Sequence, residues 1–358
     1  MQSNIRRMAD RADALGVELR PHLKTCKSVE IARLIKPGRA DITVSTLQEA
    51  EYFARAGFRD IMYAVSIVPQ KMPAIAALNR DGAGVQIILD HPSAVHAVAD
   101  QADALKARFD VWIEVDVDGH RAGLEPDDPL IVETGRAIQG SSLLNLAGVM
   151  THAGESYTCR SAAELEAHAE LERRRCVRAA ENLRTAGIEC PAVSVGSTPT
   201  ALSAPSLEGV SELRAGVYVF FDLFQAGLGV CSVDDIALSV LATVISHKTS
   251  HRRLIVDAGG LALSKDRGTA DQAVDCGYGL VADAVSGRLI PGLSVSAANQ
   301  EHGIIELPPG FNFQQFPLGS QLRILPNHAC MTAAAHGSFF VMDGEDRVID
   351  RWERSNGW

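Results

Sequence analysis

The sequence predicts an α/β protein in which a (β/α)8 barrel of the TIM type is followed by a β-rich domain. Two observations carry this prediction. From residue 3 to about residue 220, short β-like runs alternate with helical stretches, which is typical of a parallel sheet wrapped by helices. After about residue 235, strand-like runs joined by turns follow one another with little helix between them. We therefore expect a barrel domain over residues 1–232 and a second domain over residues 233–358.

The barrel prediction depends on eight strand candidates, one for each βα unit. In chain order they are "VELRPHL" (17–23), "ITVST" (42–46), "DIMYAV" (60–65), "VQIIL" (85–89), "VWIEVDV" (111–117), "AGVMTH" (147–152), "AVSVGS" (192–197) and "SELRAG" (211–216).

The helices between these strands carry start and stop signals. The helix in "SVEIARLIK" begins after a capping Ser28, and the helix in "TLQEAEYFARAG" has Thr46 as its N-cap and Gly57 as its stop. The long stretch "SAAELEAHAELERRRCVRAAENLRTAG" predicts a solvent-facing helix. Its His168 and Cys176 are therefore interpreted as structural.

Strands dominate the predicted second domain. They are expected within "IALSVLATVISHK", "RRLIVDAGG", "GRLIPGLSVSAANQEHGIIEL" and "QLRILPNHAC". No internal repeat beyond the βα unit and no low-complexity linker accompanies them.

Composition argues against several classes of protein. The chain has 358 residues, a formal net charge of -10 and no long basic run, which argues against a nucleic-acid partner. No apolar stretch is long enough for a membrane helix, and "MQSNIRRMAD" lacks the apolar segment of a secretory signal. The seven cysteines are scattered without CxxC spacing, so a disulfide framework is not expected. These features indicate a cytosolic (cytoplasmic) protein with no membrane partner.

Reactive side chains follow the predicted barrel strands at their carboxyl ends, where the active sites of such barrels lie. They are Lys24 after the first strand, Ser45 and Thr46 after the second, Tyr63 after the third, Arg121 after the fifth, and His152 and Tyr157 after the sixth.

A candidate phosphate site follows the seventh strand. Barrels of this class often hold phosphate in the loops after strands seven and eight, and Ser197-Thr198-Pro199 offers hydroxyls, amides and a proline at the first helical position. The alternative is that this tripeptide is an ordinary helix cap.

Lys24 beside a phosphate site fits a Schiff base with pyridoxal phosphate (PLP). Cationic neighbours and partial burial lower the pKa of a lysine and make it a better nucleophile. His22 shares the strand face of Lys24 if the strand continues, because residues two apart point the same way. The alternative is a surface lysine paired with a carboxylate.

A family resemblance extends in order over essentially the whole chain. The segments "RPHLKTCK", "VSTLQEAEYF", "DIMYAVSIVP", "DVDGHRAG", "THAGESY", "VSVGSTPT", "ELRAGVYVFFD", "NQEHG" and "LPNHAC" together resemble the D-serine dehydratase / D-threonine aldolase family of PLP enzymes, which has the alanine-racemase-like fold type III. Within it, "VSVGSTPTAL", "RAGVYVFFDL" and "ANQEHG" are most similar to the bacterial D-threo-3-hydroxyaspartate dehydratases.

The resemblance implies roles for individual residues. Lys24 carries PLP, Arg121 lies near the phenolic oxygen of the cofactor, His152 packs against the pyridine ring and Tyr157 is the partner of the ring nitrogen. A further set, at or near the phosphate, comprises Ser197, Thr198, Gly216 and Tyr218.

The chain departs from the family pattern in two places. The family has histidine two residues after the lysine, where this chain has Cys26, which we interpret as a packing variant. The family also begins with a segment containing Asp-Thr-Pro that adds a strand to the second domain, whereas this sequence starts at "QSNIRRM". We expect that strand to be missing or to lie upstream.

A metal site is predicted at "PNHAC". His328 and Cys330 are two apart on a probable strand, so their side chains share a face, and both are good zinc ligands. Spacing alone leaves the absence of a metal open, since structural zinc sites have four protein ligands and catalytic sites usually three. The resemblance favours zinc, because dehydratases of the family carry His-x-Cys and aldolases His-x-Asp.

The resulting hypothesis is a PLP- and zinc-dependent dehydratase of D-3-hydroxyamino acids. Lys24 takes the α-proton, zinc draws off the β-hydroxyl, and an oxo acid and ammonia result. The substrate-side candidates are Tyr63, Asn299, Gln300 and His302, although "NQEHG" is equally interpreted as a turn. The resemblance implies a homodimer.

Three alternatives stay open. The chain could instead catalyse retro-aldol cleavage to glycine and an aldehyde, or racemisation with a second base. The third alternative is a PLP-binding protein that is not an enzyme.

Overall fold

The computed structural model describes residues 1–38, 41–344 and 347–357. The chain divides into two compact units. We call Ile5–Gly216, joined by Gly357, the barrel unit, and Met1–Asn4 with Val217–Asn356 the C-terminal unit. The division falls after Gly216, and the boundary expected at 232/233 stays a prediction.

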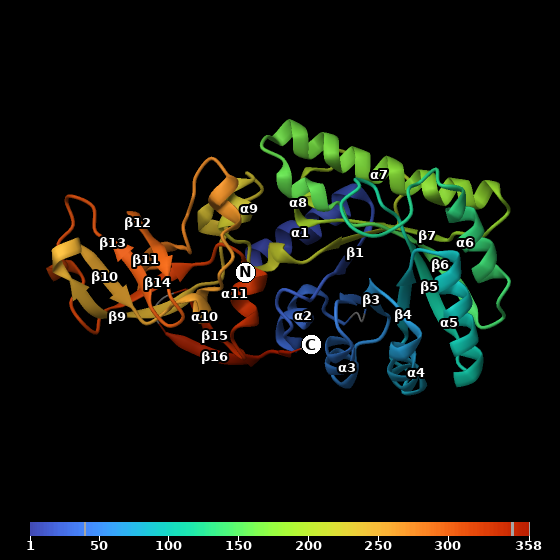
Figure 1. The fold of residues 1–358 in the computed structure, drawn as a ribbon, viewed down its shortest axis with the longest axis horizontal. Coiled ribbons are helices and arrows are strands. Elements are labelled where there is room, and N and C mark those ends of the chain that lie inside the picture. Colours follow the sequence, from blue (N-terminus) through green and yellow to red (C-terminus); the bar gives the residue numbers. More distant parts are fainter. Residues whose placement is uncertain (39–40, 345–346, 358) are drawn as a thin grey trace. The chain divides into compact units, whose positions relative to one another are not determined.

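The barrel unit is an eight-stranded parallel sheet in the order β1-β8-β7-β6-β5-β4-β3-β2. All eight strands predicted from the sequence are present, and Figure 1 shows helices lying outside them. The strands are β1 (Glu18–Pro21), β2 (Ile42–Val44), β3 (Ile61–Ser66), β4 (Val85–Leu89), β5 (Phe109–Glu114), β6 (Leu144–Met150), β7 (Ala192–Val195) and β8 (Glu212–Ala215). β1 pairs with β8, and the ring closes toward β2 through an isolated bridge between His22 and Thr43. The predicted (β/α)8 fold is therefore confirmed.

The helices of the barrel unit alternate with these strands. They are α1 (Gln2–Leu15, whose first residues belong to the other unit), α2 (Val29–Ile35), α3 (Leu47–Arg55), α4 (Met72–Arg80), α5 (Pro92–Leu105), α6 (Pro129–Gln139), α7 (Ala162–Thr185) and α8 (Thr198–Ser203), with short 3-10 turns η1 (Pro69–Lys71) and η2 (Gly154–Thr158). Thr46 caps α3 as predicted, because its hydroxyl accepts the Glu49 N–H. Ser28 precedes α2, but its hydroxyl bonds the Glu30 carboxylate instead of capping the backbone.

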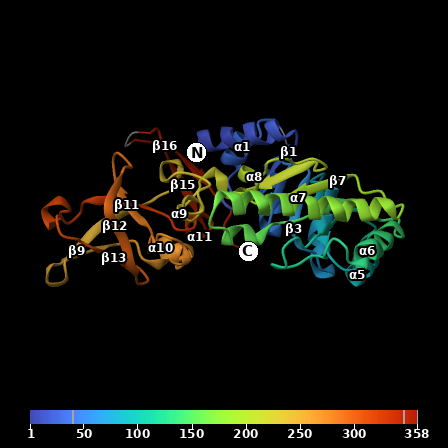
Figure 2. The ribbon, with the colours of Figure 1, turned by 90° about the horizontal axis from the view of Figure 1, so that it is seen from above.

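The long helix α7 is only partly solvent-facing. It runs alongside β7 on the outside of the barrel in both views (Figures 1 and 2). Its buried residues recur every three or four positions, as expected for an amphipathic helix: Leu165, Ala169, Glu172, Cys176, Ala179, Ala180 and Leu183. The prediction of a solvent-facing helix was therefore wrong for this stripe, which includes Cys176.

An ion network, in which Arg20 and Glu212 are buried and Asp60 is half-exposed, stabilises one end of the barrel. Arg20 on β1 donates to Glu212 on β8 at 2.8 Å and to the Asp60 carboxylate at 3.0 Å. Removing one partner of a buried ion pair leaves an uncompensated charge in the interior, which is strongly destabilising.

We expect Arg20→Met to lower the free energy of unfolding by about 3–5 kcal/mol, the cost of breaking a buried pair. Urea unfolding followed by circular dichroism measures this change. Arg55→Ala is the control, because Arg55 forms an exposed pair with Glu51 that is worth at most about 0.5 kcal/mol. Equal losses in the two variants would contradict the role assigned to the network.

The C-terminal unit contains a closed antiparallel barrel in the order β10-β13-β12-β11-β14-β9, which confirms the β-rich prediction. Its strands are β9 (Val240–Lys248), β10 (Arg253–Val256), β11 (Leu280–Asp283), β12 (Leu289–Ala298), β13 (Gly303–Glu306) and β14 (Gln321–Leu325), followed by the hairpin β15 (Ser338–Met342) and β16 (Val348–Glu353). The core includes Val256, Val281, Val295, Ile305 and Ile324.

Short helical segments and the N-terminus complete the C-terminal unit. The α-helices are α9 (Leu223–Gly227), α10 (Gly260–Leu263) and α11 (Ala329–Ala334); the 3-10 turns are η3 (Val217–Val219), η4 (Val233–Asp235), η5 (Thr249–His251), η6 (Gly268–Asp271) and η7 (Phe313–Gln315). Asn4 ties the N-terminal residues to this unit by donating to the Asp235 carbonyl at 2.7 Å. In the described part of the chain, no helix has the length and apolar character that crossing a bilayer requires.

Candidate active site

Lys24 lies in the turn that follows β1, at residues 23–26, and its side chain is exposed. The partial burial expected from the sequence is therefore not observed. The charge of Lys24 acts on both His22 and His152, so the lysine lies near the ends of β1 and β6. Cys26 is buried against the Leu23 carbonyl, which fits its interpretation as a packing residue.

His22 connects β1 with the segments after β2 and β8. Its Nε2 lies 3.3 Å from the Ser45 hydroxyl. Its carbonyl approaches Gly216 so closely that a Cβ there would lie 2.6 Å from the carbonyl oxygen, which explains the glycine. Burial, followed by the charges of Lys24 and Arg214, lowers the pKa of His22 well below its ordinary value.

His152 follows β6 and is held in one tautomer. Its Nδ1 lies 3.1 Å from the Gly196 carbonyl, and a carbonyl only accepts, so Nδ1 carries the proton. Burial, followed by the charge of Lys24, lowers the pKa of His152 to about 3. The ring of Tyr157, in η2, lies 6.3 Å from the His152 ring between centroids. The structure thus brings the uncharged His152 ring, which lies near Lys24, together with the ring of Tyr157.

The depressed pKa of His152 predicts a pH dependence of stability. Between pH 3 and the ordinary value of 6.5, the unfolded chain binds a proton at His152 that the folded chain excludes. The free energy of unfolding is therefore not lowered by His152 above pH 6.5, and it falls as the pH falls from 6.5 toward 3. We expect His152→Gln to flatten the dependence of the unfolding free energy on pH, measured by urea unfolding at several pH values. His96→Gln, at an exposed position, should leave the slope unchanged. An unaltered slope in His152→Gln would contradict the assignment.

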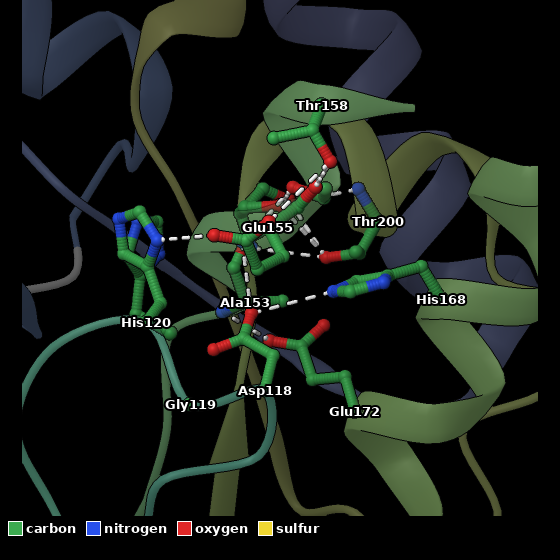
Figure 3. A network of polar contacts seen from close by, with 12 residues as sticks. Asp118, Gly119, His120, Ala153, Glu155, Thr158, His168, Glu172 and Thr200 are labelled. Atoms are coloured by element: carbon green, nitrogen blue, oxygen red, sulfur yellow. Dashed lines mark hydrogen bonds and ion pairs between the residues drawn. The ribbon is translucent and has the colours of Figure 1, made fainter. Parts of the chain in front are cut away.

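Arg121 lies on the loop after β5, where a polar network fixes the neighbouring residues. Its guanidinium is 3.7 Å from the buried Glu114 carboxylate. Figure 3 shows the network: Asp118 accepts from the Glu155 N–H at 2.9 Å and lies 3.3 Å from His168 Nε2. His120 Nδ1 lies 2.7 Å from Glu155, as Figure 3 also shows. The loop that carries Arg121 is thus tied to η2 and α7, and the interpretation of His168 as structural agrees with these contacts.

Gly154 allows this network to form. A Cβ at Gly154 would lie 2.1 Å from the His120 ring, so no other residue fits without displacing the ring. The glycine of the "HAG" segment is therefore explained by close packing.

The candidate phosphate site is the segment between β7 and α8. Ser197 acts as a helix cap: its hydroxyl accepts the Thr200 N–H at 3.2 Å, and the Thr200 hydroxyl accepts the Ser197 N–H at 3.1 Å. The capping alternative is therefore correct for the Ser197 side chain. Thr198 differs, because its hydroxyl is buried and has no hydrogen-bond partner among the described residues. A buried polar atom without a partner favours a ligand at this position.

Tyr63 is not at the end of its strand. It lies within β3, is fully buried, and its hydroxyl accepts from Lys71 at 2.9 Å. Its neighbour Met62 packs in the cluster with Ile88 and Trp112, so Tyr63 points to the opposite face of the strand. The prediction that Tyr63 ends the third strand was therefore wrong, because β3 continues to Ser66.

The His328–Cys330 segment begins a helix, whereas a strand was predicted. His328 precedes α11 and Cys330 lies in its first turn. The two side chains nevertheless come within hydrogen-bond reach of each other. His328 Nδ1 lies 2.6 Å from Asp266, and the buried Asp222 accepts the Ala329 N–H at 2.8 Å.

The neighbours of His328 fix the position of its ring and favour its protonated form. Burial lowers its pKa, but hydrogen bonds to Asp266 and Cys330 outweigh burial and raise the pKa to about 10. Among the residues the structure describes, no group of three or more histidine, cysteine or acidic side chains is arranged to hold a metal.

The remaining predicted residues lie in the C-terminal unit. Asn299, Gln300 and His302 are exposed in the turn between β12 and β13, and Gly259 packs against their backbone. Tyr218 is fully buried in η3. The turn interpretation of "NQEHG" is therefore correct, and a contact with substrate stays a prediction.

Sequence reasoning missed three residues of this region. Glu172 is buried and accepts backbone N–H groups beside the proposed site. Its charge within the apolar stripe of α7 was the sequence feature that could have identified it. Arg214 on β8 is buried and donates to the Ser194 hydroxyl and the Thr151 carbonyl. Asp266 lies in a loop with no signal in the local sequence.

Comparison with protein families gives two matches in chain order. Residues 1–223 match the model described as "Alanine racemase, N-terminal domain", and residues 237–342 match "Putative serine dehydratase domain".

Individual relatives cover the whole chain. D-threo-3-hydroxyaspartate dehydratase of Delftia sp. (strain HT23) is 50% identical over 364 residues, which is 100% of this chain and 95% of that protein. Its solved structure has a TM-score of 0.95 at 51% identity and covers 100% of this chain and 95% of its own. A cysteine-to-alanine mutant of a D-threo-3-hydroxyaspartate dehydratase has been solved in a metal-free form; it covers 100% of this chain and 95% of its own with a TM-score of 0.95 at 50% identity.

Two further relatives differ in activity. D-serine dehydratase of Dictyostelium discoideum is 30% identical over 100% of this chain and 94% of its own length. D-threonine aldolase of Arthrobacter sp. is 32% identical over 99% of this chain and 89% of its own length. By these matches the chain belongs to the alanine-racemase-like family that contains D-serine dehydratase and D-threo-3-hydroxyaspartate dehydratase.

Proposed function

We propose that this chain is a PLP- and zinc-dependent lyase that dehydrates a D-3-hydroxyamino acid, D-threo-3-hydroxyaspartate or D-serine, to a 2-oxo acid and ammonia. The observation that carries the proposal is the adjacent His328 and Cys330 side chains in a chain 50% identical to a dehydratase throughout. PLP would supply an electron sink for the α-carbanion, and zinc a Lewis acid for the β-hydroxyl.

The barrel residues fit PLP. Lys24 offers an exposed primary amine, and the buried Thr198 hydroxyl is available for a phosphate oxygen. The His22 carbonyl closely approaches Gly216. We assign Ser197, Gly216 and Tyr218 to the surroundings of the phosphate. Arg121 and Tyr157 are assigned to the phenolic oxygen and the ring nitrogen.

The C-terminal unit fits a metal with two protein ligands. Asp266 occupies Nδ1 of His328, which leaves Nε2 for the metal, and a carboxylate behind a ligating histidine is a common arrangement. The thiol of Cys330 lies beside the imidazole. Two protein ligands leave positions for water and for the substrate oxygen.

The chain's own groups then have distinct tasks. Lys24 Nζ holds the cofactor at rest and takes the α-proton from substrate. His152 is neutral and presents an uncharged ring, so it adds no positive charge beside the cofactor. Tyr157, a phenol and not a carboxylate, leaves the cofactor's ring nitrogen without an anionic partner.

Further assignments belong to the same proposal. The exposed turn residues Asn299, Gln300 and His302 contact the substrate, whereas the buried position of Tyr63 argues against its candidacy. We also propose that the protein is a cytosolic homodimer, which depends on the resemblance to the family.

The second candidate function is retro-aldol cleavage, which the 32% identity to D-threonine aldolase favours. A product assay separates the two. Purified protein is incubated with D-serine, D-threo-3-hydroxyaspartate and D-threonine, and oxo acid plus ammonia is measured against glycine plus aldehyde. We expect oxo acid and ammonia; glycine and aldehyde as the main products would establish the aldolase.

A further inference from the structure

Glu172 is the one charged residue in the buried stripe of α7, a helix that the structure describes in full. Its side chain is 2% exposed. Burying a carboxylate is costly unless hydrogen bonds compensate for the lost water. The contacts that compensate for this burial therefore indicate what the residue does.

Those contacts are backbone groups at the carboxyl ends of two strands. Glu172 Oε1 accepts the Gly196 N–H at 2.8 Å, after β7, and the Ala153 N–H at 3.3 Å, after β6. The Thr200 hydroxyl, in α8, also hydrogen-bonds to the carboxylate. Burial raises the pKa of Glu172, and these hydrogen bonds oppose that rise. Figure 3 shows Glu172 reaching from its helix toward Ala153 and Thr200.

Both N–H groups adjoin residues assigned to the cofactor. Ala153 follows His152, and Gly196 precedes Ser197 and Thr198. The Gly196 carbonyl also accepts from His152 Nδ1, so one peptide segment meets the carboxylate on one side and the imidazole on the other. A Cβ at Gly196 would lie 2.0 Å from the Arg214 carbonyl oxygen, so the segment has little space to move.

We propose that Glu172 is a positioning residue, which ties the loops after β6 and β7 together and thereby sets the His152 ring and the Thr198 hydroxyl for the cofactor. This inference depends on the proposed function, because it assumes that PLP binds there. Glu172 touches neither cofactor nor substrate; it acts through the two backbone segments.

The test compares variants that keep or remove the acceptor. Glu172→Gln keeps Oε1 as an acceptor, Glu172→Met fills similar space without one, and Glu166→Met changes an exposed glutamate of the same helix. Each protein is freed of cofactor and titrated with pyridoxal phosphate, with binding followed by absorbance and folding by circular dichroism. Turnover is then measured as kcat and KM.

We expect Glu172→Met to bind pyridoxal phosphate about 10- to 100-fold more weakly, the range found when the hydrogen-bond partner behind a metal ligand is lost, while Glu172→Gln and Glu166→Met stay near wild type. Folded Glu172→Met with wild-type affinity would overturn the inference, as would Glu172→Gln that binds as weakly as Glu172→Met. If Glu172→Met does not fold, Glu172→Asp decides, because it withdraws the carboxylate by one methylene; unchanged affinity there overturns the inference. Failure of the wild-type protein to bind pyridoxal phosphate would instead overturn the proposed function.

Discussion

Lys24→Ala is expected to lose at least about 10^3-fold in turnover, the scale of removing a catalytic base, together with the visible absorbance of the lysine-bound cofactor. In the proposed function, the amine of Lys24, which lies near His22 and His152, both holds the cofactor and moves the α-proton. Absorbance spectra and the oxo-acid assay on the same preparation measure the two losses.

Two comparison variants separate chemistry from charge. Lys24→Arg keeps the positive charge but has no nucleophilic amine, so it should also lose the absorbance and the activity. Lys248→Ala removes an exposed lysine at the end of β9 and should retain both. Retention of the cofactor spectrum by Lys24→Ala would mean that another amine carries PLP and would end the assignment.

Loss of the metal is the second large effect that we expect. His328→Ala and Cys330→Ser should each release zinc, measured by elemental analysis of the dialysed protein. Dehydration should fall by about 10^2-fold or more, because a Lewis acid contributes several kcal/mol and each 1.36 kcal/mol is about tenfold in rate. The cofactor absorbance at Lys24 should persist, which distinguishes metal loss from general damage.

His251→Ala and Cys231→Ser are the matched controls, since both residues lie in the same unit away from α11 in sequence. They should retain metal and activity. Zinc-free protein that dehydrates substrate at the wild-type rate would remove the metal from the mechanism.

The sequence was sufficient for the fold because the barrel strands and their helices are encoded locally. Short runs such as "VQIIL" and "AVSVGS" gave strands β4 and β7, and Thr46 gave the start of α3. β11 and the β15–β16 hairpin were not predicted. Local pattern also placed Lys24 after β1, although it could not show that the side chain is exposed.

The site was less predictable because its supporting contacts join distant parts of the chain. His328 depends on Asp266, 62 residues away, and Ala329 on Asp222, 107 residues away. Nothing in "PNHAC" reveals these carboxylates, so the segment was assigned to a strand although it begins α11. The prediction for Tyr63 was wrong for another reason. The sequence indicated where the third strand lies, but it did not show at which residue β3 ends.

The sparse pairing between β1 and β2 has a mechanical consequence for Lys24. Every other neighbouring pair of strands in this sheet is joined at two or more ladder positions. In the described residues, β1 and β2 meet at one bridge, His22 with Thr43, and the Leu23 N–H donates to the Thr43 carbonyl beside it. A displacement of the turn that bears Lys24 therefore disturbs this bridge and the nearby contact between His22 and Ser45, and leaves the ladders between the other strands intact. Among the described residues, Lys24 therefore follows a strand that meets one of its two neighbours, β2, at only one bridge of the sheet.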